Sequence, residues 1–424
     1  MNRYESYKDS GVEWIGEIPS LWKTMKVRSC FRERCEKISD KIFAPLSVTK
    51  NGILPQLDTA VKTDNGDNRK KVLIGDFVVN SRSDRKGSCG ISEYNGSVSL
   101  INTVLKPLNI LADYVHYMFR SNNYIEEYYR QGRGIVADLW TTRYSEMKNI
   151  QIPYPPITEQ QAIVDYLKDK TLKIEQYVSE RERERELLDS LKQSEIVNVV
   201  TKGLNPNVRM KDSGIPWIGM IPEHWEVKRL RHFIKFVSVK GHGEKPLLSV
   251  TREQGVIERN VESKEENHNF IPDDLSGYKL VRKGQFVINK MKSWQGSYGV
   301  SDYEGIVSPA YYVCDLTFPC KKFFSMAIRS KAYIPFFTQY SKGIRVDQWD
   351  LSPIGLKSIP FIVPPIEEQQ AIVDYIEAKL LKIDSCMADL QAEIDYLKEF
   401  KQRLISDVVT GQICVAKPQK GEQQ

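Results

Sequence analysis

The C-terminal part of the chain carries apolar residues at regular helical intervals over a long stretch. Between residues 367 and 409 apolar side chains recur at steps of four and three, with one break at Lys401. They are Ile383, Met387, Leu390, Ile394, Leu397, Leu404 and Val408. This spacing places them along one stripe of a helix and is typical of a coiled-coil seam. The sequence therefore predicts a helix of about 43 residues here.

A second segment of equal length, residues 158–200, has similar signals at its ends. Both segments follow a Pro-Pro pair, which cannot lie inside a helix, and both stop before a glycine, Gly203 or Gly411. The earlier segment opens with Thr158-x-x-Gln161, which fits a capping box. At 1.5 Å per residue, a helix of this length is at most about 65 Å long.

The apolar stripe of the earlier segment is weaker than that of the later one. Arg181 and Arg185 stand where the later segment has Leu390 and Ile394. The predicted seam residues of the earlier segment are Ile174, Val178, Leu188 and Val199. One interpretation is a lone exposed helix. We favour two helices that pack antiparallel within one chain, because the arginine stems can cover an apolar partner.

Each predicted helix closes one copy of a repeated unit. The string Lys-Asp-Ser-Gly-x-x-Trp-Ile-Gly-x-Ile-Pro at 8–19 returns at 211–222, and Pro-Pro-Ile-x-Glu-Gln-Gln-Ala-Ile-Val-Asp-Tyr at 155–166 returns at 364–375. The offset between copies grows from 203 residues early in the repeat to 209 later, so the second copy has six extra residues in its first half. A period near 200 residues is far too long for a solenoid and indicates two whole globular domains.

Short apolar runs predict the same elements in both domains. Residues 46–49 and 77–79, with their counterparts 248–251 and 286–288, fit strands, whereas 114–119 and 323–328 fit helices. The fold class is therefore mixed α/β, with two duplicated globular domains separated by a pair of long antiparallel coiled-coil helices in a pseudo-two-fold arrangement. The predicted boundaries are domain 1 over 1–156, a central helix over 157–203, domain 2 over 204–365, a C-terminal helix over 366–412 and a disordered tail over 413–424.

Composition narrows the class of protein. The chain has 424 residues, 41% of them hydrophobic and 27% charged, which is ordinary for a soluble globular protein. Neither a membrane-spanning run nor a secretory signal is visible, so we expect a cytoplasmic location. The seven cysteines form no C-x2-C pair and none recurs between copies, which disfavours a zinc site or a disulfide framework.

The sequence lacks the common catalytic motifs, and the residues shared by the two copies do not suggest a catalytic site. The sequence has no Walker A pattern, no Gly-rich loop in a Rossmann context and no Asn/Asp-Pro-Pro-Tyr/Phe string. None of the five histidines recurs between copies, and the residues that do recur are Gly, Trp, Pro and aliphatic types that maintain a fold. We therefore expect no enzymatic activity, no metal and no cofactor in this chain. The recurring Trp140 and Trp349 are expected in the core.

Basic segments follow the repeated strand at 77–79 and 286–288. Residues 80–88 and 289–297 both carry Lys or Arg beside Asn, yet their sequences differ. Arginine and lysine contact phosphates, and Arg and Asn can also read base edges, so a basic loop repeated at one place indicates DNA binding. The candidate DNA-binding residues are Asn80, Arg82, Arg85, Lys86, Arg69, Lys70, Asn289, Lys290, Lys292 and Arg345.

The paired openings and the paired Glu-Gln-Gln helices resemble those of the specificity (S) subunits of type I restriction-modification systems, over almost the whole chain. This resemblance implies that each globular domain is a target recognition domain that reads half of a bipartite double-stranded DNA target. It implies that the coiled coil sets the spacer and docks two modification (methyltransferase) subunits, which restriction (motor-nuclease) subunits join. S-adenosylmethionine, ATP and Mg would then belong to the partner subunits. Because the two loops differ, we expect an asymmetric target.

Two rival interpretations remain. Two globular domains joined by helices could form a scaffold that tethers proteins and has no DNA specificity. A stand-alone methyltransferase or nuclease is a third class, which the absent motifs disfavour.

Overall fold

The computed structural model divides the chain into two compact units. It describes residues 3–56, 66–82, 86–134, 140–260, 272, 274–343 and 349–415. Unit 1 comprises Met1–Glu182 together with Gln391–Gln424, and unit 2 comprises Arg183–Leu390. Each unit therefore contains one globular domain, one half of the central helix and one half of the C-terminal helix.

The strands of unit 1 form several small antiparallel sheets. They are β1 (Tyr7–Asp9), β2 (Glu17–Pro19), β3 (Lys23–Lys26), β4 (Phe31–Glu33), β5 (Lys37–Ile38), β6 (Leu46–Thr49), β7 (Gly52–Pro55), β8 (Arg69–Val72), β9 (Phe77–Asn80), β10 (Cys89–Ile91), β11 (Gly96–Val98), β12 (Asn102–Pro107) and β13 (Gln151–Tyr154). The largest sheet has the order β10-β9-β12-β4, and a second has the order β11-β8-β5. The remaining strands pair as β1-β2, β3-β13 and β6-β7.

The helices of unit 1 are short, apart from the last. They are α1 (Val27–Cys30), α2 (Ala112–Phe119), α3 (Asn122–Arg130) and α4 (Tyr144–Met147), followed by the long helix α5 (Ile157–Lys202). Phe77 of β9 packs against Phe119 of α2 with ring centroids 5.1 Å apart. Leu46 and Val48 lie in a separate cluster with Val78 and Val104, because alternate side chains of a strand face opposite sides of the sheet.

Unit 2 repeats much of this arrangement. Its strands are β14 (Met210–Asp212), β15 (Met220–Pro222), β16 (Glu226–Arg229), β17 (Ile234–Val237), β18 (Leu248–Thr251), β19 (Gly255–Glu258), β20 (Lys279–Val281), β21 (Phe286–Ile288), β22 (Tyr298–Val300), β23 (Gly305–Val307), β24 (Tyr312–Leu316), β25 (Ser341–Lys342), β26 (Asp350–Leu351) and β27 (Pro360–Val363). Its helices are η3 (Leu230–His232), η4 (Ser293–Gln295), α6 (Lys321–Arg329), α7 (Ile334–Tyr340), α8 (Pro353–Ser358) and the long helix α9 (Ile366–Val409). The main sheet has the order β17-β24-β21-β22, which matches β4-β12-β9-β10 strand for strand.

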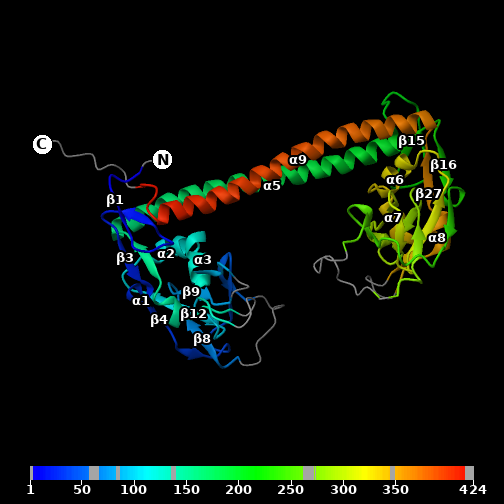
Figure 1. Cartoon of the computed structure of the whole chain (residues 1–424). Helices are drawn as coiled ribbons and strands as arrows, with labels where there is room; N and C mark the ends of the chain where they lie inside the picture. Colours follow the sequence, from blue (N-terminus) through cyan, green and yellow to red (C-terminus); the bar gives the residue numbers. More distant parts are fainter. Residues whose placement is uncertain are drawn as a thin grey trace. The chain divides into compact units, whose positions relative to one another are not determined.

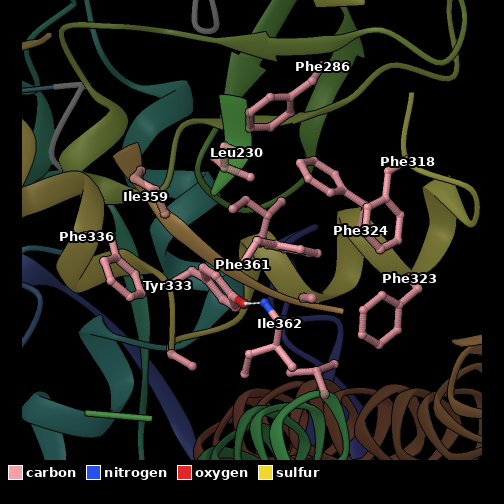
Figure 2. Close-up of a cluster of buried hydrophobic side chains, with 14 of the residues drawn as sticks. Leu230, Phe286, Phe318, Phe323, Phe324, Tyr333, Phe336, Ile359, Phe361 and Ile362 are labelled. Atoms are coloured by element: carbon pink, nitrogen blue, oxygen red, sulfur yellow. Dashed lines mark hydrogen bonds between the residues drawn. The ribbon is translucent and has the colours of Figure 1, made fainter. Parts of the chain in front are cut away.

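An aromatic core fills unit 2 (Figure 2). Phe361 of β27 contacts the rings of Phe318, Phe324 and Tyr333 at centroid distances of 5.3, 4.8 and 5.2 Å. The backbone N–H of Ile362 donates a hydrogen bond of 3.0 Å to the hydroxyl of Tyr333, which Figure 2 draws as a dashed line. This bond fixes β27 against the short helices before the chain enters α9.

The two long helices run side by side and antiparallel within each unit (Figure 1). In unit 1, Lys401 pairs with Glu175 at 3.2 Å and Lys398 pairs with Glu182 at 2.9 Å. A later residue of α5 thus pairs with an earlier residue of α9, which means that the two helices run in opposite directions. In unit 2, Lys192 of α5 pairs with Asp384 of α9. The predicted antiparallel packing is therefore present.

The predicted seam residues lie on the inner side of these helix pairs to different degrees. Ile174, Val199, Ile383, Leu390, Ile394 and Leu404 are buried, whereas Val178, Leu188, Met387 and Leu397 are half-buried. Arg181 is half-buried as well, and its Nε lies 3.5 Å from Glu393 Oε2. The weaker stripe of α5 is thus accommodated by a cation that reaches an acidic residue of the neighbouring helix.

A buried tryptophan joins each globular domain to its helices. The indole N–H of Trp22 donates to Glu159 in the first turn of α5 at 2.8 Å, and that of Trp225 donates to Glu368 in the first turn of α9 at 2.9 Å. The glycine that ends the other helix lies against the same ring. A Cβ on Gly411 would lie 3.1 Å from Trp22, and one on Gly203 would lie 3.1 Å from Trp225.

Most sequence predictions for the elements are confirmed. The predicted strands correspond to β6, β9, β18 and β21, and the two short helical runs fall inside α2 and α6. Helix α5 spans 46 residues and α9 spans 44, slightly longer than expected. The predicted tail lies outside the described residues from 416 onward, while Ile413 is 7% exposed and packs in unit 1.

The prediction of a capping box at the start of α5 is wrong. The helix begins at Ile157, so Thr158 lies inside it, and Gln161 instead donates to Asp165 at 2.8 Å. The neighbouring glutamine holds the helix start, since Gln160 is buried and donates to the carbonyl of Pro155 at 2.9 Å. Its counterpart in α9, Gln369, donates in the same way to the carbonyl of Pro364 at 2.8 Å. This shared hydrogen bond explains why the Glu-Gln-Gln string recurs.

Candidate nucleic-acid interface

Two equivalent loops leave the main sheets of the two units. Loop 1, residues 80–88, joins β9 to β10, and loop 2, residues 289–297, joins β21 to β22. Each begins with an asparagine that shapes its own turn. Asn80 Oδ1 accepts from the backbone N–H of Arg82 at 3.1 Å, and Asn289 Oδ1 accepts from that of Met291 at 3.2 Å.

The first asparagine of each loop differs in its access to a ligand. Asn289 is 5% exposed, and its amide donates to the hydroxyl of Tyr311 at 3.1 Å. Asn80 is half-buried and forms part of the wall of a small cavity. Asn80 can therefore offer its amide group to a ligand, whereas Asn289 is committed to holding loop 2.

Loop 1 presents positive charge beside aromatic rings. Arg82 is exposed, and the ammonium group of Lys86 lies 3.1 Å from Glu126 and 3.9 Å from the ring centroid of Tyr129. The ring of Trp140 lies 5.6 Å from that of Tyr129. The cavity beside the loop is lined by Asn80, Arg82, Lys86, Tyr128, Tyr129 and Trp140, among others. Amide, guanidinium and aromatic groups thus converge on one place, as contact with bases and phosphates requires.

Loop 2 carries fewer available charges. Lys290 Nζ lies 2.7 Å from Asp350 Oδ2, and the hydrogen bond to this carboxylate raises the pKa of Lys290. Lys292 is exposed. Trp294 packs on Trp349 with centroids 5.5 Å apart, whereas Trp140, the counterpart of Trp349 in unit 1, packs on Tyr129 of α3.

The other predicted residues have structural partners or lie outside the described residues. Arg69 is 5% exposed, and its guanidinium donates to the hydroxyl and the carbonyl of Ser97 at 2.9 and 3.1 Å. Burial lowers the pKa of Arg69. Lys70 donates to the carbonyl of Asn102 at 2.8 Å and lies 3.4 Å from Glu33. Arg85 and Arg345 fall outside the described residues.

Sequence reasoning misses the aromatic side of the interface. Trp140 and Trp349, predicted to lie in the core, are both half-buried and lie against the loops. Their recurrence at an offset of 209 residues, close to the end of each domain, is the only signal that the sequence offers. Nothing in the sequence shows that these positions fold back onto residues about 50 positions earlier.

Other kinds of site receive no support from the described part of the chain. There, no group of three or more His, Cys, Asp and Glu side chains is placed to hold a metal ion. Across the same residues, no helix is both long enough and apolar enough to cross a membrane.

The fold and the two loops define a duplicated two-domain protein whose domains are joined through antiparallel helices. No protein-family model matches the chain. It is 23% identical over 450 residues to the putative type I restriction enzyme MjaX specificity subunit of Methanocaldococcus jannaschii, covering 95% of this chain and 96% of that protein. It is 24% identical over 283 residues to the MjaVIII specificity subunit of the same organism, covering 63% of each.

A solved structure has the same fold. It comes from a study of complex assembly and conformational transition of the type I R-M system, and superposes with a TM-score of 0.67 at 12% identity, covering 93% of this chain and 99% of that one. The two-domain plus coiled-coil fold of this chain is therefore that of a type I R-M component.

Proposed function

We propose that the chain is the DNA sequence-recognition subunit of a type I restriction-modification complex. In this proposal each globular domain reads one half of a bipartite, asymmetric target. The observation that carries it is the pair of loops. They occupy the same place between two corresponding strands of similarly built domains, yet loop 1 presents Lys86 beside Tyr129 and loop 2 presents Trp294 beside Trp349.

The chemistry of the loops suits DNA. Arginine and lysine bind phosphates and guanine edges, and asparagine can bind adenine. In unit 1, Asn80, Arg82 and Lys86 are the candidate readers. In unit 2 the exposed Lys292 and the tryptophan pair take that role, and Lys290 shapes the loop through Asp350. Arg69 and Lys70 act on the fold of unit 1, because both are occupied by internal partners.

The helices take the role of spacer and docking surface for two modification subunits, which restriction subunits join. Each unit exposes large apolar side chains on its helix pair. In unit 1 Tyr177 and Tyr396 are 56% and 66% exposed, and in unit 2 Leu187 and Leu191 are 61% and 49% exposed. Exposed apolar side chains gathered on one element are typical of protein-binding surfaces. The chain itself then performs no chemistry, while S-adenosylmethionine, ATP and Mg bind to the partner subunits.

Mapping of methylation tests the recognition role. We expect cells that express this chain with its modification subunits to methylate one two-part sequence with different halves. A palindromic methylated sequence would contradict the asymmetry. The rival interpretation, a scaffold without DNA specificity, predicts that the purified complex retains no preference for any duplex sequence across a range of salt concentrations.

A matched deletion tests the spacer role. Removing residues 181–187 from α5 and 390–396 from α9 takes one heptad from each helix at equivalent positions. Each helix shortens by about 10 Å at 1.5 Å per residue, which corresponds to about three base pairs. We expect a shorter DNA spacer with both half-sites unchanged. A change in the half-sites themselves would assign base reading to the helices.

A further inference from the structure

A basic groove lies within unit 1, between the globular domain and its half of the helix pair. Its walls come from the turn between β6 and β7, from loop 1, from the end of α2 and from both long helices. Five basic side chains line it, namely Lys50, Lys86, Arg120, Lys168 and Lys401, with Glu175 as the acidic residue. Asn51, Asn122 and Gln402 add amide groups.

Most of this positive charge is not neutralised. Of the five cations, Lys86 is 3.1 Å from Glu126 and Lys401 is 3.2 Å from Glu175. Among the described residues, Lys50, Arg120 and Lys168 form no ion pair. Like charges gathered in a groove repel one another, and a cleft lined by one sign of charge raises the local concentration of ligands of the opposite sign.

The cation at the end of α2 is held by a neutral partner. Arg120 Nη1 lies 3.1 Å from His116 Nε2, one helical turn earlier. Burial, with a smaller contribution from Arg120, lowers the pKa of His116 to about 4. The imidazole is therefore neutral at pH 7, and it accepts a hydrogen bond from the guanidinium. Arg120 is thus oriented by His116 and its full charge is available to a ligand.

The counterpart positions in unit 2 show that the repeated frame does not itself produce a basic groove. There the equivalent residues include four basic side chains, Arg252, Arg329, Lys331 and Lys192, and three acidic ones, Glu253, Glu377 and Asp384. Arg329 replaces Arg120, but it donates to the carbonyls of Arg252 and Glu253 at 3.2 and 2.7 Å. Glu377 replaces Lys168 and pairs with Lys322 at 2.8 Å.

We propose that the groove of unit 1 binds the sugar–phosphate backbone of duplex DNA, independently of sequence and separately from base reading by loop 1. The inference rests on the proposed function. Loop 1 and the groove share Lys86 and Gly87, so a duplex on the loop continues directly onto the groove. Unpaired ammonium and guanidinium groups together with side-chain amides are the donors that phosphate oxygens accept. The counterpart positions of unit 2 carry more acidic residues and occupied cations, so this particular grip on the backbone lies on one side of the target only.

The test removes two groove charges from the full-length chain. We expect Arg120→Gln combined with Lys168→Gln to weaken binding to two unrelated 40-base-pair duplexes equally, because these phosphate contacts carry no sequence information. Removing one phosphate contact lowers the slope of log K against log salt by about 0.9, so the slope falls by about 1.8 and binding at 0.1 M salt weakens by more than about tenfold. Fluorescence anisotropy titrations at several salt concentrations measure both quantities.

Two matched variants serve as controls. Arg252→Gln combined with Lys331→Gln removes two exposed charges from the counterpart positions of unit 2, and its salt slope should equal that of the unchanged chain. Arg120→Lys keeps the charge and should keep the slope, which separates charge from folding.

The outcomes distinguish failure of the groove from failure of the proposed function. If the unchanged chain binds DNA with a steep salt slope and the groove variant matches it, the groove does not hold DNA and the inference is wrong. If the unchanged chain binds no duplex, alone or with its modification subunits, the proposed function fails and the groove proposal fails with it.

Discussion

Units 1 and 2 share the strand order of their main sheets, yet one buried tyrosine differs in a way that the sequence explains. In unit 2 the hydroxyl of Tyr333 accepts the backbone N–H of Ile362 at 3.0 Å. In unit 1 the equivalent Tyr124 is 2% exposed, and its hydroxyl has no hydrogen-bond partner among the described residues. The residue equivalent to Ile362 is Pro153, which has no N–H to donate.

The same comparison applies to the surfaces. Trp140 packs on Tyr129 of α3 in unit 1, whereas its counterpart Trp349 packs on Trp294 of loop 2. Arg120 is held by a neutral histidine, whereas its counterpart Arg329 is occupied by backbone carbonyls. Duplication has thus preserved the frame at the level of strand pairing and has left side chains around the loops free to diverge. Differences between equivalent positions are therefore the best guide to what each unit binds.

The largest expected effect comes from exchanging whole recognition surfaces. Replacing residues 20–150 by the equivalent domain of a relative should change one half of the target and leave the other half intact, because unit 2 has its own core. Replacing residues 223–359 should do the reverse. Methylation mapping reads the outcome. If either exchange altered both halves, the two units would not read DNA separately.

The buried tryptophans come next. We expect Trp22→Ala and Trp225→Ala each to cost about 3–5 kcal/mol in the stability of their own unit, since both side chains are fully buried and each donates to a helix. Hydrogen exchange of amides in each unit measures the loss of stability. Trp217→Ala is the control, because that side chain is 43% exposed and should cost less than half as much. Equal losses from all three would refute the anchoring role.

Replacing Tyr333 or Tyr124 by Phe should change the free energy of unfolding by less than the tryptophan substitutions do, and in opposite directions. Tyr333→Phe leaves the buried N–H of Ile362 without its partner and should cost about 1–3 kcal/mol. Tyr124→Phe removes a buried hydroxyl that has no partner among the described residues, so stability should stay the same or rise by up to about 1 kcal/mol. Urea denaturation of the two variants compares them. A destabilisation by Tyr124→Phe as large as that by Tyr333→Phe would show that unit 1 satisfies its hydroxyl.

The loop charges should have the smallest effect on stability, because substitutions of exposed side chains change it little, and an unequal effect on DNA binding. Replacing Arg82, Arg85 and Lys86 by Ala should lower the salt slope of DNA binding by about 0.9 for each phosphate that is no longer bound. In loop 2 we expect a change from Lys292→Ala but almost none from Lys290→Ala, since Asp350 already occupies Lys290. Binding titrations at several salt concentrations measure the slopes. An unchanged slope after the triple replacement would remove loop 1 from the interface.

The sequence predicts those features that repeat or that follow from local periodicity. The two long helices, the strands at 77–79 and 286–288 and the duplicated domains all follow from spacing and recurrence, since burial of one face imposes a period on the sequence. The helix start at Ile157 is missed because the decisive hydrogen bonds are those of Gln160 with Pro155 and with Leu111, and the second partner is 49 residues away.

The candidate site is less predictable than the fold. Arg69 looks like a surface cation in a basic segment, but its partner Ser97 lies 28 residues away on β11, the strand that pairs with β8. The sequence singles out the loop positions as a place where the two copies diverge. The aromatic residues that flank the loops, and the groove beside loop 1, depend on tertiary packing. A side chain's partner across the sheet is set by the register of distant strands, which no local pattern encodes.

One joint in unit 1 is closed by hydrogen bonds where unit 2 has a continuous backbone. In unit 2 the chain runs from Gly203 at the end of α5 directly into β14. In unit 1 the end of α9 is held to the β1–β2 segment by two hydrogen bonds. The hydroxyl of Tyr7 donates to the carbonyl of Gly411 at 3.0 Å, and the side-chain amide of Gln412 donates to the carbonyl of Glu17 at 2.8 Å. The architecture therefore tolerates either kind of connection at this junction. A circularly permuted gene that fused the helix to the first hairpin through a short peptide, and reopened the chain between Gly203 and Met210, should yield the same pair of domains.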